Sequence, residues 1–265
     1  MSDAGLGSTS MTASTLLAID VGNTRTKWGV FGSDGELKAH GVVATEALAT
    51  LQLSPAWAGC QRAVVSNVAG EQAKAALDHV LGAMDIRYIR SSAAACGVRS
   101  QYRNPAQLGT DRWAALIAAW HHYHAPCVVV SAGTAVTVDA LLPEAASNRG
   151  IFLGGYILPG LNLMQQSIAD KAPGVRMGEG ELQDFPANTA DALYSGSLNA
   201  IAGAVRALAA RLAMHEHEAP KIIIAGGDAE AIYELLAQDG GLAAHLAIAD
   251  NLVLQGLLIL ESEIR

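Results

Sequence analysis

The sequence predicts an α/β protein built from two related halves, and its pattern of elements carries this prediction. Each half opens with three consecutive strand-like segments and then alternates helices with strands, which predicts helices packed on a mainly parallel sheet with an antiparallel hairpin edge. Each half also places a Gly-containing turn directly after its first buried strand. These turns are Asp20–Thr24, after the apolar run Leu16–Ile19, and Ser131–Ala135, after the apolar run Cys127–Val130. The matching order suggests a duplicated domain, although the identity between the halves is too low to prove it.

The first half contains segments that fit five strands and two helices. Ser33-Asp34-Gly35 is a turn signal between the second and third strands. Apolar residues recur at helical spacing before Gly82, which is a typical helix stop. The expected strands are 16–21, 26–31, 36–43, 63–68 and 86–89, with a short helix from Thr45 and a helix over 70–81. Residues 91–109 are polar and indicate an irregular linker or an active-site loop.

The second half begins with an amphipathic helix from about Thr110, because Trp113, Leu116 and Trp120 fall on one helical face. The further expected strands are 127–132, 135–142, 150–158, 221–225 and 245–248, and the further helices are 161–169, 189–213, 228–237 and one from about 250. We therefore expect an N-terminal domain over 15–108 and a C-terminal domain over 109–265. A disordered tail over 1–14 is expected to precede them.

Composition favours a compact globular protein of the cytoplasm. Of the 265 residues, 51% are hydrophobic and 16% are charged, and the net charge is −8. These values argue against disorder and against nucleic acid or an anionic membrane as partners. Cys60, Cys96 and Cys127 are scattered without metal-ligand spacing, as in a protein with reduced thiols. The segment 1–14 lacks the charged start of a signal peptide, and no apolar run reaches the ~20 residues of a membrane span.

The first Gly turn contains residue types that suit a phosphate group. Gly22 permits close approach of the backbone to a ligand. Backbone N–H groups, together with Asn23, Thr24 and Thr26, can donate hydrogen bonds to phosphate oxygens, and Lys27 adds a positive charge. The same residue types are common in a plain hairpin turn, so the motif alone leaves both interpretations open.

Two further residues extend this interpretation. Asp20, at the end of a buried strand, can hold Mg²⁺ through water. Thr134 belongs to the second turn, which by itself is more typical of a bend between core strands. It gains weight from the first turn, because two such turns facing each other would clamp a polyphosphate.

The segment Gly109-Thr110-Asp111-Arg112 admits a structural and a chemical interpretation. In the structural one, Asp111 favours the N-terminal helix dipole and Thr110 can cap the helix. In the chemical one, Asp111 accepts a proton from a substrate hydroxyl during phosphoryl transfer, and Arg112 grips a substrate carboxylate bidentately. Taken alone, the residues favour the structural interpretation.

Other polar positions are less informative by themselves. Asn188-Thr189 fits the N-cap of the long helix, and Gly226-Gly227 fits either close approach to a nucleotide or a strand-to-helix turn. Tyr102 can line a pocket or lie on the loop surface. The histidines near helix ends fit solvated termini better than a metal site; they are His121, His122, His124, His215 and His217.

Taken together, these motifs resemble type III pantothenate kinase, a member of the actin and sugar-kinase fold superfamily. The resemblance extends over nearly the whole chain from about Leu16. It implies two duplicated actin-like (ribonuclease H-like) domains with the active site in the cleft between them. The motifs that carry it occur in the family's order: Asp20–Lys27, Tyr102 with Gly109–Arg112, Gly133-Thr134-Ala135, Gly154-Gly155 through Pro159-Gly160, and Asn188-Thr189 with Ala192 and Gly196.

The resemblance implies ATP-dependent phosphorylation of pantothenate to 4'-phosphopantothenate, the first step of coenzyme A biosynthesis. It implies a homodimer with the substrate site close to the interface, and a requirement for Mg²⁺ and a monovalent cation, K⁺ or NH₄⁺. Asp111 matches the family's proton acceptor. The implied ATP and phosphate contacts are Asp20, Gly22, Asn23, Thr24, Arg25, Thr26, Lys27 and Thr134. The implied pantothenate contacts are Tyr102, Gly109, Thr110, Asp111, Arg112 and Thr189.

Ser131 departs from the family pattern. Many relatives carry at this position an Asp that ligates the monovalent cation, whereas a hydroxyl coordinates K⁺ more weakly, so we assign no ligand to that cation. Two other functions remain open on the sequence. One is another small-molecule kinase of the superfamily. The other is a regulatory accessory protein, against which the intact Asp111 and phosphate loops argue.

Overall fold

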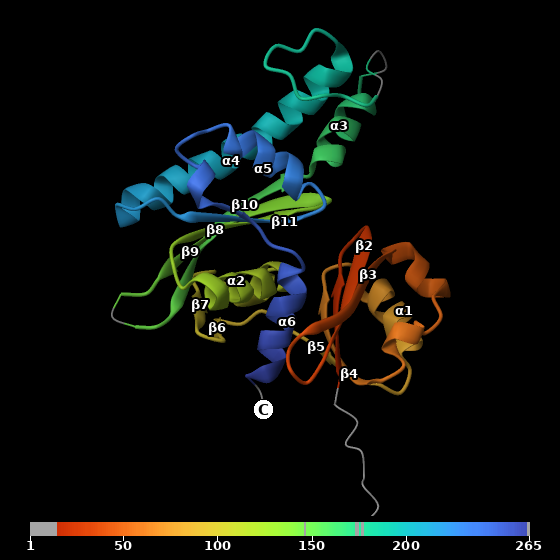
Figure 1. Cartoon of the computed structure of the whole chain (residues 1–265). Helices are drawn as coiled ribbons and strands as arrows, with labels where there is room; N and C mark the ends of the chain where they lie inside the picture. The colour runs from red at the N-terminus through yellow and green to blue at the C-terminus, as the bar shows by residue number, and fades with distance from the viewer. Residues whose placement is uncertain (1–14, 146, 173–174, 176–177, 264–265) are drawn as a thin grey trace, which may run out of the picture.

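The computed structural model describes residues 15–145, 147–172, 175 and 178–263, which form two α/β lobes (Figure 1). The first lobe is built on a five-stranded sheet and the second on a seven-stranded sheet. The tail expected over 1–14 lies outside the described residues. No helix in the described ranges is long and apolar enough to cross a bilayer.

The expected strands and helices are present with small shifts at their ends. The five-stranded sheet contains β1 (Thr15–Val21), β2 (Arg25–Phe31), β3 (Leu37–Ala44), β4 (Cys60–Asn67) and β5 (Asp85–Tyr88). The seven-stranded sheet contains β6 (Ala94–Ala95), β7 (Val98–Ser100), β8 (Cys127–Ala132), β9 (Ala135–Pro143), β10 (Gly150–Pro159), β11 (Lys221–Gly226) and β12 (Leu246–Ile248). The α-helices are α1 (Glu71–Leu81), α2 (Thr110–Tyr123), α3 (Leu161–Ala169), α4 (Thr189–Glu216), α5 (Ala229–Ala237) and α6 (Leu252–Ser262). Short 3₁₀ turns occur at Thr45–Thr50, Pro55–Trp57, Pro105–Gln107 and Ala243–His245.

The strand order confirms the duplication. The first sheet runs β3-β2-β1-β4-β5, and the second contains the matching series β10-β9-β8-β11-β12. In each, the first strand of the half pairs antiparallel with the strand that follows it and parallel with a strand reached through a helix. This is the predicted combination of an antiparallel hairpin edge with parallel strands.

The segment 91–109 differs from the expected irregular loop. It contains β7, which pairs parallel with β10, and β6, which pairs antiparallel with β7. The buried alternate residues of β7, Val98 and Ser100, explain the pairing, but three residues are too few to produce a clear alternating pattern. These strands extend the second sheet, whereas α6 packs on β1 and β4 of the first sheet, so the chain passes between the lobes more than once. The boundary at 108/109 stays a prediction.

Helices α2 and α6 lie between the two sheets, as Figure 1 shows. Their buried side chains form one core with residues from both sheets, including Ala18 and Val64 of the first and Val129 and Ile223 of the second. Helices α4 and α5 cover the other face of the seven-stranded sheet, and α1 covers the other face of the five-stranded sheet. The N-terminus of α2, where the Gly109–Arg112 motif lies, is therefore held between the two lobes.

Candidate active site

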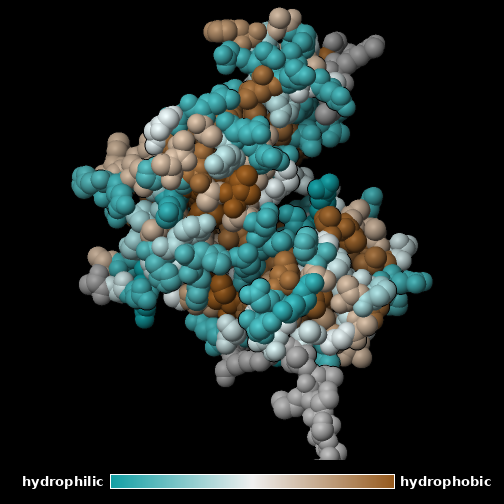
Figure 2. All heavy atoms as spheres, viewed as in Figure 1, coloured by the Kyte–Doolittle hydropathy of each residue, from teal (hydrophilic) through white to brown (hydrophobic). Residues whose placement is uncertain are grey.

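The two Gly turns face each other across the cleft, as the sequence predicted. The Thr134 hydroxyl of the second turn donates a hydrogen bond of 2.9 Å to the Thr24 hydroxyl of the first. Both side chains are exposed, and Figure 2 shows the surface indented between the two lobes on the right of the view. The hydroxyl-rich turns of the two halves thus meet at one place on the surface.

Thr45 supports the first turn through two hydrogen bonds to its backbone. Its hydroxyl donates to the Gly22 carbonyl at 2.6 Å, and its backbone N–H donates to the Thr24 carbonyl at 2.9 Å. Thr26 is buried and shares a hydrogen bond of 3.0 Å with the Thr45 hydroxyl. Successive side chains of a strand alternate in direction, so Thr26 supports the turn from within while residues 23–25 are exposed. Direct contact of Thr26 with phosphate is therefore the least supported of the expected contacts.

Two glycines that pack against the second turn have no room for a side chain. A Cβ atom at Gly160 would lie 2.0 Å from the Gly133 carbonyl oxygen, and the Gly160 N–H donates to the Thr134 carbonyl at 2.8 Å. A Cβ atom at Gly226, which has φ of +115°, would lie 2.0 Å from the Ala132 carbonyl oxygen. These close approaches lock the turn against β11 and the start of α3, and they give Gly226 a structural role.

Asp20 lies at the end of β1 with an unsatisfied carboxylate oxygen. Its Oδ1 atom is buried and has no hydrogen-bond partner among the described residues. Burial raises the pKa of Asp20 to about 7, and the nearby Asp111 carboxylate adds to the rise, whereas Lys27 and Ser66 lower it. A buried, unpaired carboxylate oxygen beside a second carboxylate favours a bound cation, and oxygen ligands suit Mg²⁺.

Asp111 is fixed at the first turn of α2. Its Oδ1 accepts a hydrogen bond of 2.8 Å from the Arg112 N–H, and a Cβ atom at Gly109 would lie 2.5 Å from that oxygen. The Thr110 hydroxyl shares a hydrogen bond of 2.9 Å with the Ser66 hydroxyl at the end of β4, which ties the start of α2 to the first lobe. Burial raises the pKa of Asp111, and Arg112 offsets part of the rise. A raised pKa makes the carboxylate a stronger base.

Arg112 is held in a buried ion pair with Asp139, a residue of β9. The guanidinium Nε donates to Asp139 Oδ2 at 3.1 Å and Nη2 donates to Oδ1 at 2.5 Å, while Nη1 donates to the Tyr102 hydroxyl at 3.0 Å. The side chains of Arg112 and Asp139 are only 5% and 2% exposed. Since a guanidinium has five N–H donors, these bonds leave one on each terminal nitrogen. The Nε–Nη2 edge, which a bidentate grip on a substrate carboxylate can use, is already filled.

Thr189 lies apart from the other expected substrate contacts. It is exposed at the start of α4, where the Asn188 side chain accepts a hydrogen bond of 2.9 Å from the Asp191 N–H and caps the helix. Helix α4 packs on the face of the seven-stranded sheet opposite to α2, and in Figure 1 its first turns lie at the top, beside α3. This chain alone therefore does not bring Thr189 to Asp111.

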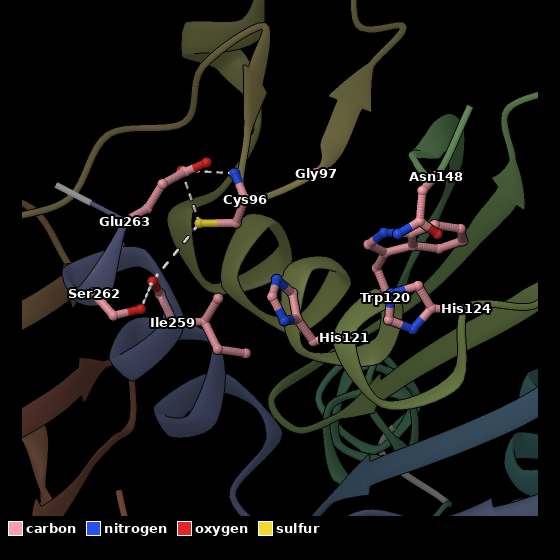
Figure 3. A pocket seen from close by; sticks show the side chains of 9 residues that line it. All are labelled: Cys96, Gly97, Trp120, His121, His124, Asn148, Ile259, Ser262 and Glu263. Carbon is pink, nitrogen blue, oxygen red and sulfur yellow. Dashed lines mark hydrogen bonds between the residues drawn. The ribbon is translucent and has the colours of Figure 1, made fainter.

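A cavity of about 360 Å³ lies at the other end of α2, between the C-terminal ends of α2 and α6. Figure 3 shows His121, His124 and Trp120 on one side of it, and Cys96 hydrogen-bonded to Glu263 on the other. Because the nearest lining residue of α2, Trp120, is nine positions after Asp111, about 14 Å of helix or more separates this cavity from Asp111. Over the residues that the structure describes, no group of three or more His, Cys, Asp or Glu side chains is arranged to hold a metal ion.

The sequence interpretation missed three residues that shape the site. Thr45 and Ser66 gave no signal, because a hydroxyl at the end of a strand or in a short turn is common. Asp139 did give one: it is the single charged residue in the apolar strand Ala135–Pro143. A buried acid requires a partner, and Arg112 of the Gly109 motif was the available one.

Comparisons with known proteins agree on one family. The model of the family described as type III pantothenate kinase matches residues 16–211. A type III pantothenate kinase from Methylobacillus flagellatus is 46% identical over 252 residues, which cover 94% of this chain and 98% of the relative. One from Nitrosospira multiformis is 43% identical over 253 residues, covering 94% and 91% of the two chains.

Solved structures confirm the actin-like, sugar-kinase fold. A Baf family protein from Campylobacter jejuni matches with a TM-score of 0.58 and 22% identity, covering 93% of this chain and 98% of that one. A protein from Sinorhizobium meliloti described as a 2-dehydro-3-deoxygalactonokinase matches with a TM-score of 0.57 and 16% identity, covering 94% and 99%. At these identities the matches bear on the fold alone.

Proposed function

Because this chain belongs to the type III pantothenate kinase family and phosphorylates pantothenate with ATP in coenzyme A biosynthesis, we propose that the reaction takes place at Asp111, in the cleft between the lobes. The observation that carries this proposal is the position of Asp111. Its half-buried carboxylate lies beside Asp20 at the junction of the two lobes, and the two Gly turns meet across the same cleft.

Asp111 acts as the general base. Its carboxylate accepts the proton of the primary hydroxyl of pantothenate while that oxygen bonds to the γ-phosphorus of ATP. The bond between the γ-phosphorus and the β–γ bridging oxygen breaks, and ADP leaves with that oxygen. The proton remains on the Asp111 carboxylate. Burial favours this proton transfer because it raises the pKa of Asp111, and most of the remaining rate enhancement comes from positioning and charge neutralisation.

The facing turns hold the phosphates of ATP. The exposed first turn offers backbone N–H groups and polar side chains, and the second adds the Thr134 hydroxyl, which is within hydrogen-bond reach of the first turn. The proposed phosphate contacts are Gly22, Asn23, Thr24, Arg25, Lys27 and Thr134, with Thr26 supporting the turn. Arg112, Tyr102, Gly109 and Thr110 hold pantothenate.

Asp20 is the proposed Mg²⁺ ligand, through water. The buried and unpartnered Oδ1 of Asp20 and its high pKa fit a site that is completed by a cation. When bound, Mg²⁺ neutralises charge on the phosphates. A monovalent cation, K⁺ or NH₄⁺, is also proposed, with its ligands unassigned because Ser131 occupies the position at which many relatives carry an Asp.

The active unit is proposed to be a homodimer in the cytoplasm. The location of Thr189 supports this assembly: it lies on α4, across the seven-stranded sheet from Asp111. If Thr189 contacts pantothenate, as the family resemblance implies, a second copy of the chain must supply it. Each substrate site then combines Asp111 of one subunit with Thr189 of the other.

A coupled assay of ADP release tests the function. We expect release that depends on pantothenate, with Mg²⁺ present and with stimulation by K⁺. If pantothenate increases ADP release neither with K⁺ nor without it, the function is wrong. Sugars and N-acetylhexosamines serve as alternative acceptors, and turnover with them alone would indicate another kinase of the superfamily.

A mixing experiment tests the shared site. Asp111→Asn and Thr189→Tyr are each expected to have low activity alone. When the two variants are mixed and allowed to exchange subunits, some dimers regain one site with an intact Asp111 and an intact Thr189. Recovery of activity on mixing supports the shared site. No recovery, despite subunit exchange shown by a size or label measurement, contradicts it.

A further inference from the structure

We propose that Asp139 is a positioning residue of the acceptor site, which holds Arg112 by one edge and thereby fixes the direction in which Arg112 meets pantothenate. The proposal rests on the function proposed above and adds a residue from β9 of the second lobe to a motif located on α2. It depends on the geometry of one buried cluster: Arg112, Asp139, Tyr102, Phe152 and Gly155.

Asp139 fixes the Arg112 guanidinium in its plane. Two hydrogen bonds join Nε and Nη2 of Arg112 to the two carboxylate oxygens of Asp139. The guanidinium also lies over the rings of Tyr102 and Phe152, with centroids at 5.7 and 5.8 Å, and these two rings stack with centroids 5.4 Å apart. A bidentate pair inside an aromatic pocket leaves the guanidinium little freedom to rotate.

The fold makes room for this pair. Asp139 is opposite Gly155 in the β9–β10 ladder, and a Cβ atom at Gly155 would lie 2.2 Å from Asp139 Oδ1 and 2.3 Å from the Val138 carbonyl oxygen. Any other residue at this position would therefore displace the carboxylate. Gly155 of β10 thus leaves the space in which Asp139 of β9 presents its carboxylate to α2.

The ion pair with Asp139 decides which edge of the Arg112 guanidinium is left for a substrate carboxylate. With Nε and one N–H of Nη2 bonded to Asp139, and one N–H of Nη1 bonded to Tyr102, the free donors of Arg112 lie at the Nη1–Nη2 end. A substrate carboxylate can meet Arg112 only there. Without Asp139, the guanidinium is free to turn towards its neighbour Asp111 and pair with the base itself.

Asp139→Asn tests this choice of edge in the full-length protein. The KM for pantothenate is expected to rise by about tenfold to a hundredfold, the usual effect of a misplaced charged hydrogen bond. The KM for the analogue with a hydroxymethyl group in place of the carboxylate is expected to change little. A structural defect alone would not produce this contrast between the two substrates.

Glu144→Gln is the matched control. Glu144, which directly follows β9, also accepts two hydrogen bonds from one arginine, Arg99 of β7, away from the site. If folded Asp139→Asn matches this control in KM for both substrates, the positioning role is wrong. If wild-type protein shows no turnover of pantothenate at all, the proposed function fails and this role fails with it.

Asp139→Glu decides the case in which Asp139→Asn does not fold. It keeps the charge but adds a methylene group, so the KM for pantothenate should rise while that for the hydroxymethyl analogue should not. Wild-type KM values for both substrates, or equal rises for both, would overturn the proposal.

Discussion

Replacing Asp111 by Asn removes the proposed base with little change in local shape. The amide oxygen of Asn can still accept the hydrogen bond that the Arg112 N–H donates to Asp111 Oδ1 at 2.8 Å. It fits the same space above Gly109, which has no Cβ atom to obstruct it. The start of α2 should therefore persist in the variant, so that a change in rate reports on the chemistry.

The expected loss of kcat is about 10²–10⁴-fold, the usual contribution of a general base. This corresponds to about 3–5 kcal/mol of transition-state free energy, at about 1.4 kcal/mol for each factor of ten. Stability should change in the opposite direction. Burial raises the pKa of Asp111, so above that pKa its negative charge lowers the free energy of unfolding, and a neutral amide relieves the cost. The Tm at neutral pH should equal or exceed that of wild type.

The assay combines ADP release at saturating pantothenate with thermal unfolding of the same samples. Asp78→Asn on α1 is a control, because it removes an Asp that pairs with Lys74 far from the cleft. Its activity should stay near that of wild type. An unchanged rate for Asp111→Asn would show that Asp111 is not the base. A loss of rate accompanied by a lower Tm would refute the argument that the helix start is preserved.

Three further predictions follow from the same geometry. Without Mg²⁺, the contribution of Asp20 to the free energy of unfolding should fall as pH rises from about 4 to about 7, because its pKa is raised from 3.8 to about 7 in the folded state; Tm measured against pH should be flatter for Asp20→Asn, and identical slopes would contradict this. Gly155→Ala should destabilise the protein by roughly 1–3 kcal/mol, because the added Cβ would lie 2.2 Å from Asp139 Oδ1; chemical denaturation measures this, and an unchanged midpoint would count against the buried pair. Ser131→Asp should reduce the K⁺ concentration needed for half-maximal activity, because a carboxylate binds K⁺ more strongly than a hydroxyl; an unchanged K⁺ titration would place the cation elsewhere.

The elements that could be predicted from the sequence are those with long, regular patterns. Apolar runs before Gly turns located β1 and β8, and the helical repeat of Trp113, Leu116 and Trp120 located α2. Strand β7 could not be predicted with confidence from three residues, because its pairing depends on β10, which comes about fifty residues later in the chain. Local pattern locates an element, whereas sheet order is decided by contacts distant in the sequence.

The residues of the site were predictable to different degrees. Asp111 and the Gly turns could be proposed from the sequence because they belong to contiguous motifs, and their roles stay predictions. The family resemblance pointed to Thr189, but no local pattern says that the sheet separates it from Asp111. Asp139 stood out as a lone acid in an apolar strand, but its partner Arg112 lies 27 positions earlier in the chain, and the fold is needed to show that the two meet.

The duplication explains how the two lobes came to supply different charges. In the first lobe, Asp20 of β1 lies two residues before Gly22 and pairs in register with Lys27 of β2. The equivalent pair in the second lobe is Ser131 with Thr137, which is uncharged. There the acid, Asp139, lies two residues further along the strand and faces Arg112 instead of the turn.

This shift gives the two lobes different charged groups in the proposed site. In the first lobe the charged pair lies beside the turn, where phosphates and their cation need both signs of charge. In the second lobe the turn offers only neutral groups, such as the Thr134 hydroxyl, and the acid lies further along the strand, where it pairs with Arg112 and is proposed to orient the acceptor substrate. In the proposed site, the turns of both lobes therefore serve the phosphoryl donor, and the second lobe also serves the acceptor through Asp139. On this argument, loss of charge at Asp20 should affect ATP and Mg²⁺ dependence first, and loss of charge at Asp139 should affect pantothenate dependence first.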